Sequence, residues 1–197
     1  MSTPPTQTPP GDHEHFDLTF EGAVDVGLIE ATFENCVFKE VNLADSSLKY
    51  SVFQDCRFVG CDLSRAKVNG AAFRDCTFER CRMMGLDWSV IGGLVFSIKM
   101  AECKARYSVF DALTLKWCGF NKTDLAECSF QECDLTGVRF DDCDLTRAQF
   151  TRAKLIRTHL AGATGVSLSP NSATFKATII NLDAAAALLA AQGVIIE

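Results

Sequence analysis

Residues 51–70 read SVFQDCRFVGCDLSRAKVNG, and the stretches on either side repeat this pattern without a gap. Three successive segments align at a period of 20 residues: 31–50, 51–70 and 71–90. Three more align later in the chain: 108–127, 128–147 and 148–167. A sustained period of this length is typical of a solenoid, in which each repeat packs only on its neighbours.

A shorter period lies inside the long one, because a large apolar residue recurs at every fifth position. The first run comprises Leu28, Phe33, Phe38, Leu43, Leu48, Phe53, Phe58, Leu63, Val68, Phe73, Phe78, Met83 and Trp88. The second comprises Met100, Ala105, Phe110, Leu115, Phe120, Leu125, Phe130, Leu135, Phe140, Leu145, Phe150, Leu155 and Leu160. Leu18 and Ala23 extend the first run backwards. A period of five fits neither a 3.6-residue helix nor a long alternating strand. Four pentads per 20 residues predict a square coil, and roughly seven coils spaced about 4.8 Å apart predict a rod of about 34 Å.

All ten cysteines occupy one position of the pentad, two residues before a residue of these runs, in which Ala105 is the one small member. They are Cys36, Cys56, Cys61, Cys76, Cys81, Cys103, Cys118, Cys128, Cys133 and Cys143. Residues two apart in extended chain point to the same side, so these thiols are expected to point inward. Without a Cys-x-x-Cys pair or a secretion signal, the pattern favours packed, reduced thiols over a zinc or redox role.

The pentads resemble those of the pentapeptide-repeat proteins, whose unit is a small residue, Asp or Asn, Leu or Phe, a polar residue and Gly. The best matches are CDLSR at 61–65, TDLAE at 123–127, CDLTG at 133–137 and CDLTR at 143–147. The resemblance covers residues 18–165. It implies an all-β fold, the right-handed quadrilateral β-helix.

Composition excludes several classes of protein. A chain of 197 residues with 48% hydrophobic residues builds one core, not a two-domain enzyme. No run of 18 apolar residues or signal peptide is evident, so we expect a cytoplasmic protein without a membrane partner. A net charge of −6 argues against direct binding of nucleic acid. No set of catalytic, phosphate-binding or metal-ligating residues is evident, so we expect no enzyme activity, no cofactor and no metal.

The two runs are out of phase, because 12 residues separate Trp88 from Met100. The intervening segment, 89–99, is apolar and contains a glycine pair that permits a sharp bulge. In one interpretation Leu94, Val95 and Phe96 still pack inward. In the other the segment protrudes and contacts a partner, as loops on rigid frameworks often do. The candidate loop residues are Val90, Ile91, Gly92, Gly93, Leu94 and Phe96.

Charge is nearly balanced along the predicted rod but uneven locally. Residues 18–165 contain 20 acidic and 18 basic side chains. Acids gather between residues 124 and 144, and four bases without an acid follow. A negative strip for binding a partner is therefore predicted at Asp124, Glu127, Asp134, Asp141, Asp142 and Asp144. The alternative is that these are ordinary solvated positions.

Both ends leave the repeat. Residues 1–17, rich in Pro and Thr, predict a disordered tail. At the other end, 166–197 predicts a cap and dimerisation segment: Pro170 ends the pattern, a short strand covers 175–180, and Asn181 begins a helix that Gly193 stops. So short a helix needs a packing partner, and a solenoid end needs a cap. The expected dimer interface is Leu182, Leu188, Leu189, Val194 and Ile196.

Two pentad blocks, a short phase break and a terminal helix with an apolar strand resemble the topoisomerase-protecting subgroup of the family, the Qnr, McbG, MfpA and AlbG proteins. Residues 81–89, CRMMGLDWS, are most similar to the albicidin-resistance type. The resemblance implies a DNA-mimicking homodimer that binds DNA gyrase or another type II topoisomerase and protects it from poisons, as antibiotic resistance or self-immunity. The nearly neutral rod departs from the subgroup's negative surface. The alternative is a generic protein-interaction scaffold without topoisomerase activity.

Overall fold

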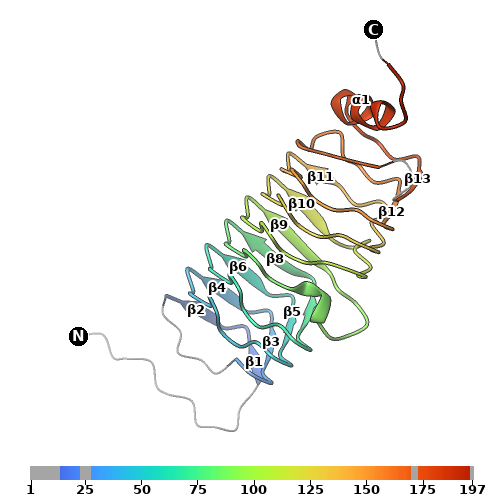
Figure 1. The fold of residues 1–197 in the computed structure, drawn as a ribbon. Coiled ribbons are helices and arrows are strands. Elements are labelled where there is room, and N and C mark those ends of the chain that lie inside the picture. The colour runs from blue at the N-terminus through green and yellow to red at the C-terminus, as the bar shows by residue number, and fades with distance from the viewer. Residues whose placement is uncertain (1–13, 23–27, 170–172, 196–197) are drawn as a thin grey trace.

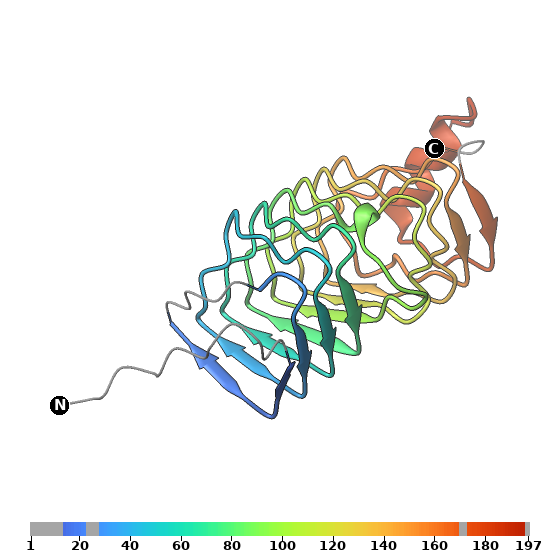
Figure 2. The ribbon, with the colours of Figure 1, turned by 90° about the horizontal axis from the view of Figure 1, so that it is seen from below.

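The computed structural model describes residues 14–22, 28–169 and 173–195. The chain winds into a rod of stacked coils, with the first strands at one end and a single helix at the other (Figure 1). Strands of successive coils lie side by side along the rod (Figure 2). The predicted all-β solenoid with a short C-terminal helix and strand is therefore confirmed.

Parallel strands line two adjacent faces of the rod and form three sheets. The first face carries β1 (Glu14–Phe16), β3 (Thr32–Glu34), β5 (Val52–Gln54) and β7 (Ala72–Arg74), and further along β12 (Lys154–Ile156) and β13 (Thr174–Lys176). The second face carries β2 (Thr19–Glu21), β4 (Val37–Lys39), β6 (Arg57–Val59), β8 (Cys76–Glu79), β9 (Ile98–Ala101), β10 (Gly119–Asn121) and β11 (Phe140–Asp141). On the third and fourth faces, isolated bridges join each coil to the next. Examples are Asp124 to Asp144 on the third face and Ser129 to Gln149 on the fourth.

At most corners between faces, one residue in each pentad has a positive φ. Examples are Asp55 at 52°, Arg65 at 56° and Asp75 at 50°. This left-handed conformation is unfavourable for most L-residues and is best tolerated by Gly, Asn and Asp. The corner amide nevertheless bonds to the next coil, since the N–H of Asp55 donates to the carbonyl of Arg74 at 2.9 Å. Such bonds between coils hold the square section.

The core is a filled stack of large side chains. Every residue of the two runs from Leu28 to Leu160 is buried, which confirms the pentad interpretation. Phe33, Phe53 and Phe73 stack at 5.1 and 4.9 Å between ring centroids. On the fourth face, Trp88 lies directly before the phase break and begins a stack of rings that continues after it. Its ring lies 5.2 Å from Phe73 and 6.1 Å from Phe110, so Trp88 joins the two halves of the core.

The first coil differs from the prediction in its register. Its strands pair with residues 18 positions later rather than 20, because His15 lies opposite Phe33 and Phe20 opposite Phe38. Phe20 therefore points inward and Leu18 is 45% exposed, so the assignment of Leu18 to the core was wrong. The predicted tail at 1–17 was also too long, because residues 14–16 form β1. Residues 1–13 and Ala23 lie outside the described residues.

At the other end the solenoid continues past residue 165, where it was predicted to stop, because residues 174–176 and Ile179 pair with the preceding coil. The strand expected at 175–180 is part of this continuation, since β13 pairs in parallel with β12. The helix α1 (Leu182–Ala190) follows, and the side chain of Asn181 caps it by accepting from the N–H of Ala184 at 2.9 Å. Ala184 is buried and Leu188 packs partly buried against the core, so α1 covers the end of the rod.

Within the described ranges, no helix has the length and apolar character needed to cross a membrane.

Candidate interaction surface

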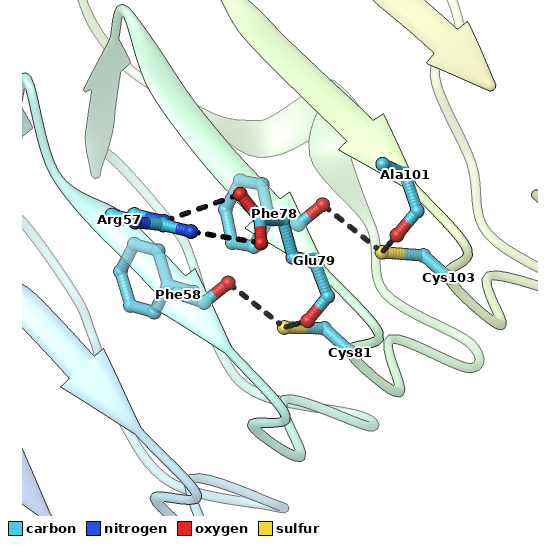
Figure 3. Close-up of polar contacts among 7 residues, drawn as sticks. All are labelled: Arg57, Phe58, Phe78, Glu79, Cys81, Ala101 and Cys103. Atoms are coloured by element: carbon cyan, nitrogen blue, oxygen red, sulfur yellow. Dashed lines mark hydrogen bonds and ion pairs between the residues drawn. The ribbon is translucent and has the colours of Figure 1, made fainter.

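The thiols lie inside the rod and bond to its backbone. All ten cysteines are buried and free. Cys81 donates to the carbonyls of Phe58 and Glu79, both at 3.4 Å, and Cys103 donates to those of Phe78 and Ala101, both at 3.3 Å (Figure 3). Burial raises the pKa of Cys56 to about 12. Among the described residues, no group of three or more His, Cys, Asp and Glu side chains is arranged to hold a metal ion.

The predicted acidic strip lies on more than one of the outer faces of the rod. Asp124 and Asp144 stack on the third face, where they form a bridge, and Glu127 follows at the next corner. Asp141 belongs to β11 on the second face, and Asp142 turns the corner between these two faces. The structure therefore brings these five acids onto adjoining surfaces.

Asp134 does not join them. It lies on the first face, bridged to Thr114 and Lys154, which is half a coil away from both Asp124 and Asp144. The Nζ atoms of Lys116 and Lys154 are 3.1 and 4.0 Å from its carboxylate. Burial opposes ionisation of Asp134, but hydrogen bonds from Thr136 and Lys116 outweigh it and hold its pKa below the ordinary value. Asp134 is thus a neutralised acid on the opposite face.

Bases offset much of the remaining strip. Arg106 lies 3.5 Å from Glu127 and 3.9 Å from Asp124, and Arg139 lies 2.8 Å from Asp141. Asp144 accepts bonds from the backbone and hydroxyl of Thr146 at 2.9 and 2.6 Å. Asp142 is exposed. Within the part of the chain that the structure describes, no ion pair reaches Asp142 or Asp144, so the negative charge of the strip is concentrated there.

In the phase-break segment, part of the chain packs inward and part protrudes, so each of the two interpretations holds for some of its residues. A 3-10 turn, η1 (Trp88–Val90), is followed by a loop in which Leu94 is fully exposed and Val95 is 42% exposed. Phe96 is buried, with its ring 5.4 Å from Trp88. Ile91 packs partly buried against the core. The loop therefore protrudes at Leu94 and Val95 and is anchored at both sides.

Gly92 explains how the loop leaves the rod. A Cβ at Gly92 would lie 2.5 Å from the carbonyl oxygen of Gly70 in the preceding coil. Gly93 follows with a φ of 85°. The glycine pair predicted to permit a bulge thus provides close backbone contact and a left-handed turn.

Sequence reasoning missed one surface feature, which we call the charged edge. It is the corner between the first and second faces, where strand registers stack one residue from each coil. In chain order these residues are Asp17, Asn35, Asp55, Asp75, Ser97, Trp117, Gly137, Arg157 and Ala177. The 20-residue alignment already placed Asn35, Asp55 and Asp75 together, but the side chains beside them become neighbours only when the coils stack. A shallow hollow lined by Phe16, Asp17, Glu34, Asn35 and Asp55 lies at its N-terminal end.

The apolar surface at the C-terminus is open on a single chain. Leu182 is 83% exposed, Leu189 40% and Val194 45%. Ile195, which was not among the expected interface residues, is 85% exposed. Leu188 faces the rod instead. Ile196 lies outside the described residues.

The described coils stack parallel strands around a core of large buried side chains, and this arrangement defines a β-solenoid protein. The family model for a pentapeptide repeat region matches residues 26–110, and the model for eight copies of the pentapeptide repeat matches 114–147 and 143–166. The chain belongs to the pentapeptide-repeat family.

One solved structure supports the same fold, and a second is similar only at a low TM-score. A trypsin-treated form of QnrB1, a plasmid-mediated fluoroquinolone resistance protein, is 17% identical with a TM-score of 0.52, over 93% of this chain and 100% of that chain. HetL, a pentapeptide repeat protein involved in heterocyst differentiation regulation from Nostoc sp. strain PCC 7120, is 14% identical with a TM-score of 0.27, over 84% of each chain. No curated protein sequence matches this chain.

Proposed function

We propose that the protein is a dimeric pentapeptide-repeat protein that binds DNA gyrase or another type II topoisomerase and protects it from poisons. The observation that carries this proposal is the full-length likeness of the rod to a fluoroquinolone resistance protein. That likeness concerns the fold alone. The phase break and the open apolar C-terminus add features that resemble the topoisomerase-protecting subgroup, and the albicidin-resistance type is the proposed relative. Such a protein acts by binding in the cytoplasm and needs no catalytic group.

The proposed dimer joins two rods through α1 and the residues after it. Leu182, Leu189 and Val194 supply exposed apolar surface there, which a second copy would remove from water. Each rod spans eight coil spacings, or about 38 Å, so two rods placed end to end span roughly 76 Å, close to the length of about 22 base pairs at 3.4 Å each.

In this proposal Asp142 and Asp144 provide the principal DNA-like charge, with Asp124, Glu127 and Asp141 beside them. Charge complementarity to a basic saddle that normally holds DNA would speed association and weaken with salt. The opposite face, with Asp134, contributes little. Leu94 and Val95 then contact the topoisomerase as an apolar projection.

The decisive experiment measures gyrase supercoiling and cleavage complexes with a poison at increasing protein concentration. We expect the wild type to restore supercoiling and lower cleavage. Asp142→Lys with Asp144→Lys should weaken binding. Glu40→Lys is the matched control, because Glu40 turns the same corner as Asp142 far from the strip. Leu94→Ser with Val95→Ser should reduce protection more than binding, because both side chains are exposed on the projecting part of the loop. Unchanged supercoiling and cleavage at tens of micromolar dimer, with gyrase of the native host, would rule the proposal out.

One observation favours the alternative of a generic interaction scaffold. Ion pairs between adjacent coils, such as Arg65 with Asp45 at 2.7 Å and Arg82 with Asp62 at 2.9 Å, neutralise much of the surface. A scaffold needs no DNA-like field. Binding of the protein to a different cellular protein, with no effect in the gyrase assay, would support this second function.

A further inference from the structure

The charged edge carries opposite charges at its two ends. The corner residue of each coil is flanked by one outward residue on either side of the corner. In the first four coils these positions contain the acids Asp17, Glu34, Asp55 and Asp75 and the bases Arg57 and Arg74. In the last four coils they contain Lys116, Arg139, Arg157 and Lys176 and no acid. The edge is therefore acidic toward the N-terminus and basic toward the C-terminus.

Most of these charges are available to a partner. Glu34, Asp55 and Asp75 are exposed at the acidic end, and Arg157 and Lys176 at the basic end. Three of the bases are already paired: Arg57 with Glu79 at 3.0 Å, Lys116 with Asp134 at 3.1 Å and Arg139 with Asp141 at 2.8 Å. The acidic end is therefore more negative than the count implies, and Arg157 and Lys176 provide the free positive charge of the basic end. Within the described ranges, none of the five exposed side chains Glu34, Asp55, Asp75, Arg157 and Lys176 forms an ion pair within 4 Å.

An exposed aromatic side chain lies between the two ends. Ser97 is the middle residue of the edge. Trp117 occupies the corner of the next coil, and its side chain is 57% exposed. Val95, two residues before Ser97, adds apolar surface to the same region. Interfaces characteristically have an aromatic residue near the centre and charged residues toward the rim.

We propose that two copies of this chain associate side by side and antiparallel along the charged edge. A twofold axis near Ser97 would bring Glu34 against Arg157 of the second copy and Asp17 against its Lys176. The same axis repeats both contacts at the other end, because a twofold interface uses the same surface on each copy. Trp117 of each copy would lie near the axis, beside Asp75 of the other.

A second copy fits this edge better than a uniformly charged partner. An acidic protein would pair with only the basic half and be repelled by the acidic half, and a basic protein would do the reverse. The antiparallel copy satisfies both halves at once. The corner line spans eight coil spacings, or roughly 38 Å, which is long enough for an interface of ordinary size. This contact is separate from the proposed C-terminal joint, so both can form in one assembly.

Zero-length carbodiimide cross-linking of the full chain tests the arrangement directly. This reagent joins a carboxylate to a lysine amine only when the two are in contact. Within one chain Asp17 and Lys176 are about 38 Å apart along the rod, and an end-to-end dimer separates them further. We expect cross-linked peptides that join Lys176 to Asp17 or Glu34, in the dimeric fraction, at low salt. Their loss at 1 M salt follows from a Debye length of about 3 Å.

Charge exchange gives an independent measurement. In sedimentation at low salt, Glu34→Arg should weaken lateral association at least tenfold, because it meets Arg157 twice in each dimer. The double variant Glu34→Arg with Arg157→Glu should return to within about threefold of the wild type. Glu40→Arg is the matched control, since Glu40 turns the next corner of the same coil and faces away.

The proposal is overturned if wild-type protein gives no Lys176 cross-link to Asp17 or Glu34, or if the charge exchange fails to restore association. Neither result bears on gyrase protection, which the supercoiling assay measures separately.

Discussion

At the scale of single residues, the inward positions of the pentad explain the unusual composition. A thiol is small enough for the position beside the large apolar residue and still bonds to the backbone of the preceding coil. Cys133 donates to the carbonyl of Phe110 at 2.9 Å and Cys128 to that of Ala105 at 3.0 Å. Cysteine thus behaves here as a small apolar residue with a weak donor.

Removal of a stacked ring tests the packing of the core. Phe53 is fully buried between Phe33 and Phe73, so Phe53→Ala should lower the free energy of unfolding by about 3–5 kcal/mol. Urea denaturation measures this loss. Leu94→Ala is the control, because the Leu94 side chain is fully exposed and its removal should change stability by less than about 0.5 kcal/mol. Equal effects of the two variants would contradict the burial described above.

The burial of each large residue from Leu28 to Leu160 could be predicted from the sequence, because a strict period assigns the same environment to every member. The prediction that Leu18 is buried was wrong for the same reason, because it assumed the strict period. The first coil is two residues shorter than the others, and a fixed period cannot detect that Phe20 replaces Leu18 as the inward residue. Only the pairing of β2 with β4 reveals it.

At the scale of elements, the C-terminal helix was largely predictable. Asn181 is a strong capping residue, and the Ala-rich segment after it begins α1 as expected. Which side faces the rod was not predictable, since Leu182, Leu188 and Leu189 are equally apolar. The structure turns Leu188 inward and leaves the other two exposed.

Because Leu188 faces the rod and Leu182 and Leu189 are exposed, different substitutions should affect the stability of the rod and the proposed dimer. Leu182→Asp with Leu189→Asp should abolish the C-terminal joint without unfolding the rod, because both side chains are exposed. Sedimentation at high salt, which screens the charged edge, should then show monomer. Leu188→Asp should instead lower the melting temperature, because it places a charge against the core. A wild type that is monomeric at tens of micromolar would contradict the joint.

The phase-break loop could be located from sequence but not oriented. Two extra residues break the period, yet nothing local distinguishes Leu94, which is exposed, from Phe96, which is buried. The deciding contact is tertiary, between Gly92 and the backbone of Gly70.

Gly92→Ala therefore has a definite expected effect. Its Cβ would lie 2.5 Å from the Gly70 carbonyl oxygen, so the loop must shift, at a cost of about 1–3 kcal/mol in thermal or urea unfolding. Gly119→Ala is the matched control, because its nearest neighbour would be Cγ of Lys99 at 3.8 Å. A neutral Gly92→Ala would show that the loop does not pack on Gly70.

At the scale of the whole molecule, the acidic strip shows what linear clustering cannot predict. Seven acids between residues 124 and 144 suggested one surface. Because that stretch is a full coil, it passes every face of the rod, and Asp134 emerges opposite Asp124. The bases that offset these acids come from neighbouring coils, as Arg106 does for Glu127.

The buried thiols make the stability of the whole rod sensitive to alkali. Burial raises the pKa of Cys118, Cys128 and Cys133 to about 12 and that of Cys143 to about 11, whereas an unfolded thiol ionises near about 8.5. A raised pKa in the folded state gives stability that is complete below the unfolded pKa and is lost as pH rises toward the folded value. Each of these thiols should therefore lower the free energy of unfolding by about 1.4 kcal/mol per pH unit above about pH 9.

Urea titrations with reductant from pH 7 to pH 10 measure this slope. Above about pH 9, the combined variant Cys128→Ala, Cys133→Ala and Cys143→Ala should show a slope smaller by about 4 kcal/mol per pH unit than the wild type. Constant stability across this range in the wild type would contradict the burial of the thiols.

The regular coil also limits how such a rod can change its length. Each turn uses 20 residues over most of the chain and advances the rod by about 4.8 Å, as the pitch of a screw thread does. An insertion of 20 residues would lengthen the molecule by one pitch and leave every later side chain pointing the same way. An insertion of five would rotate everything after it by a quarter turn, and the aromatic rings would no longer meet. The two extra residues before Met100 avoid this rotation because they bulge outward, so the strands on both sides of the loop remain in register.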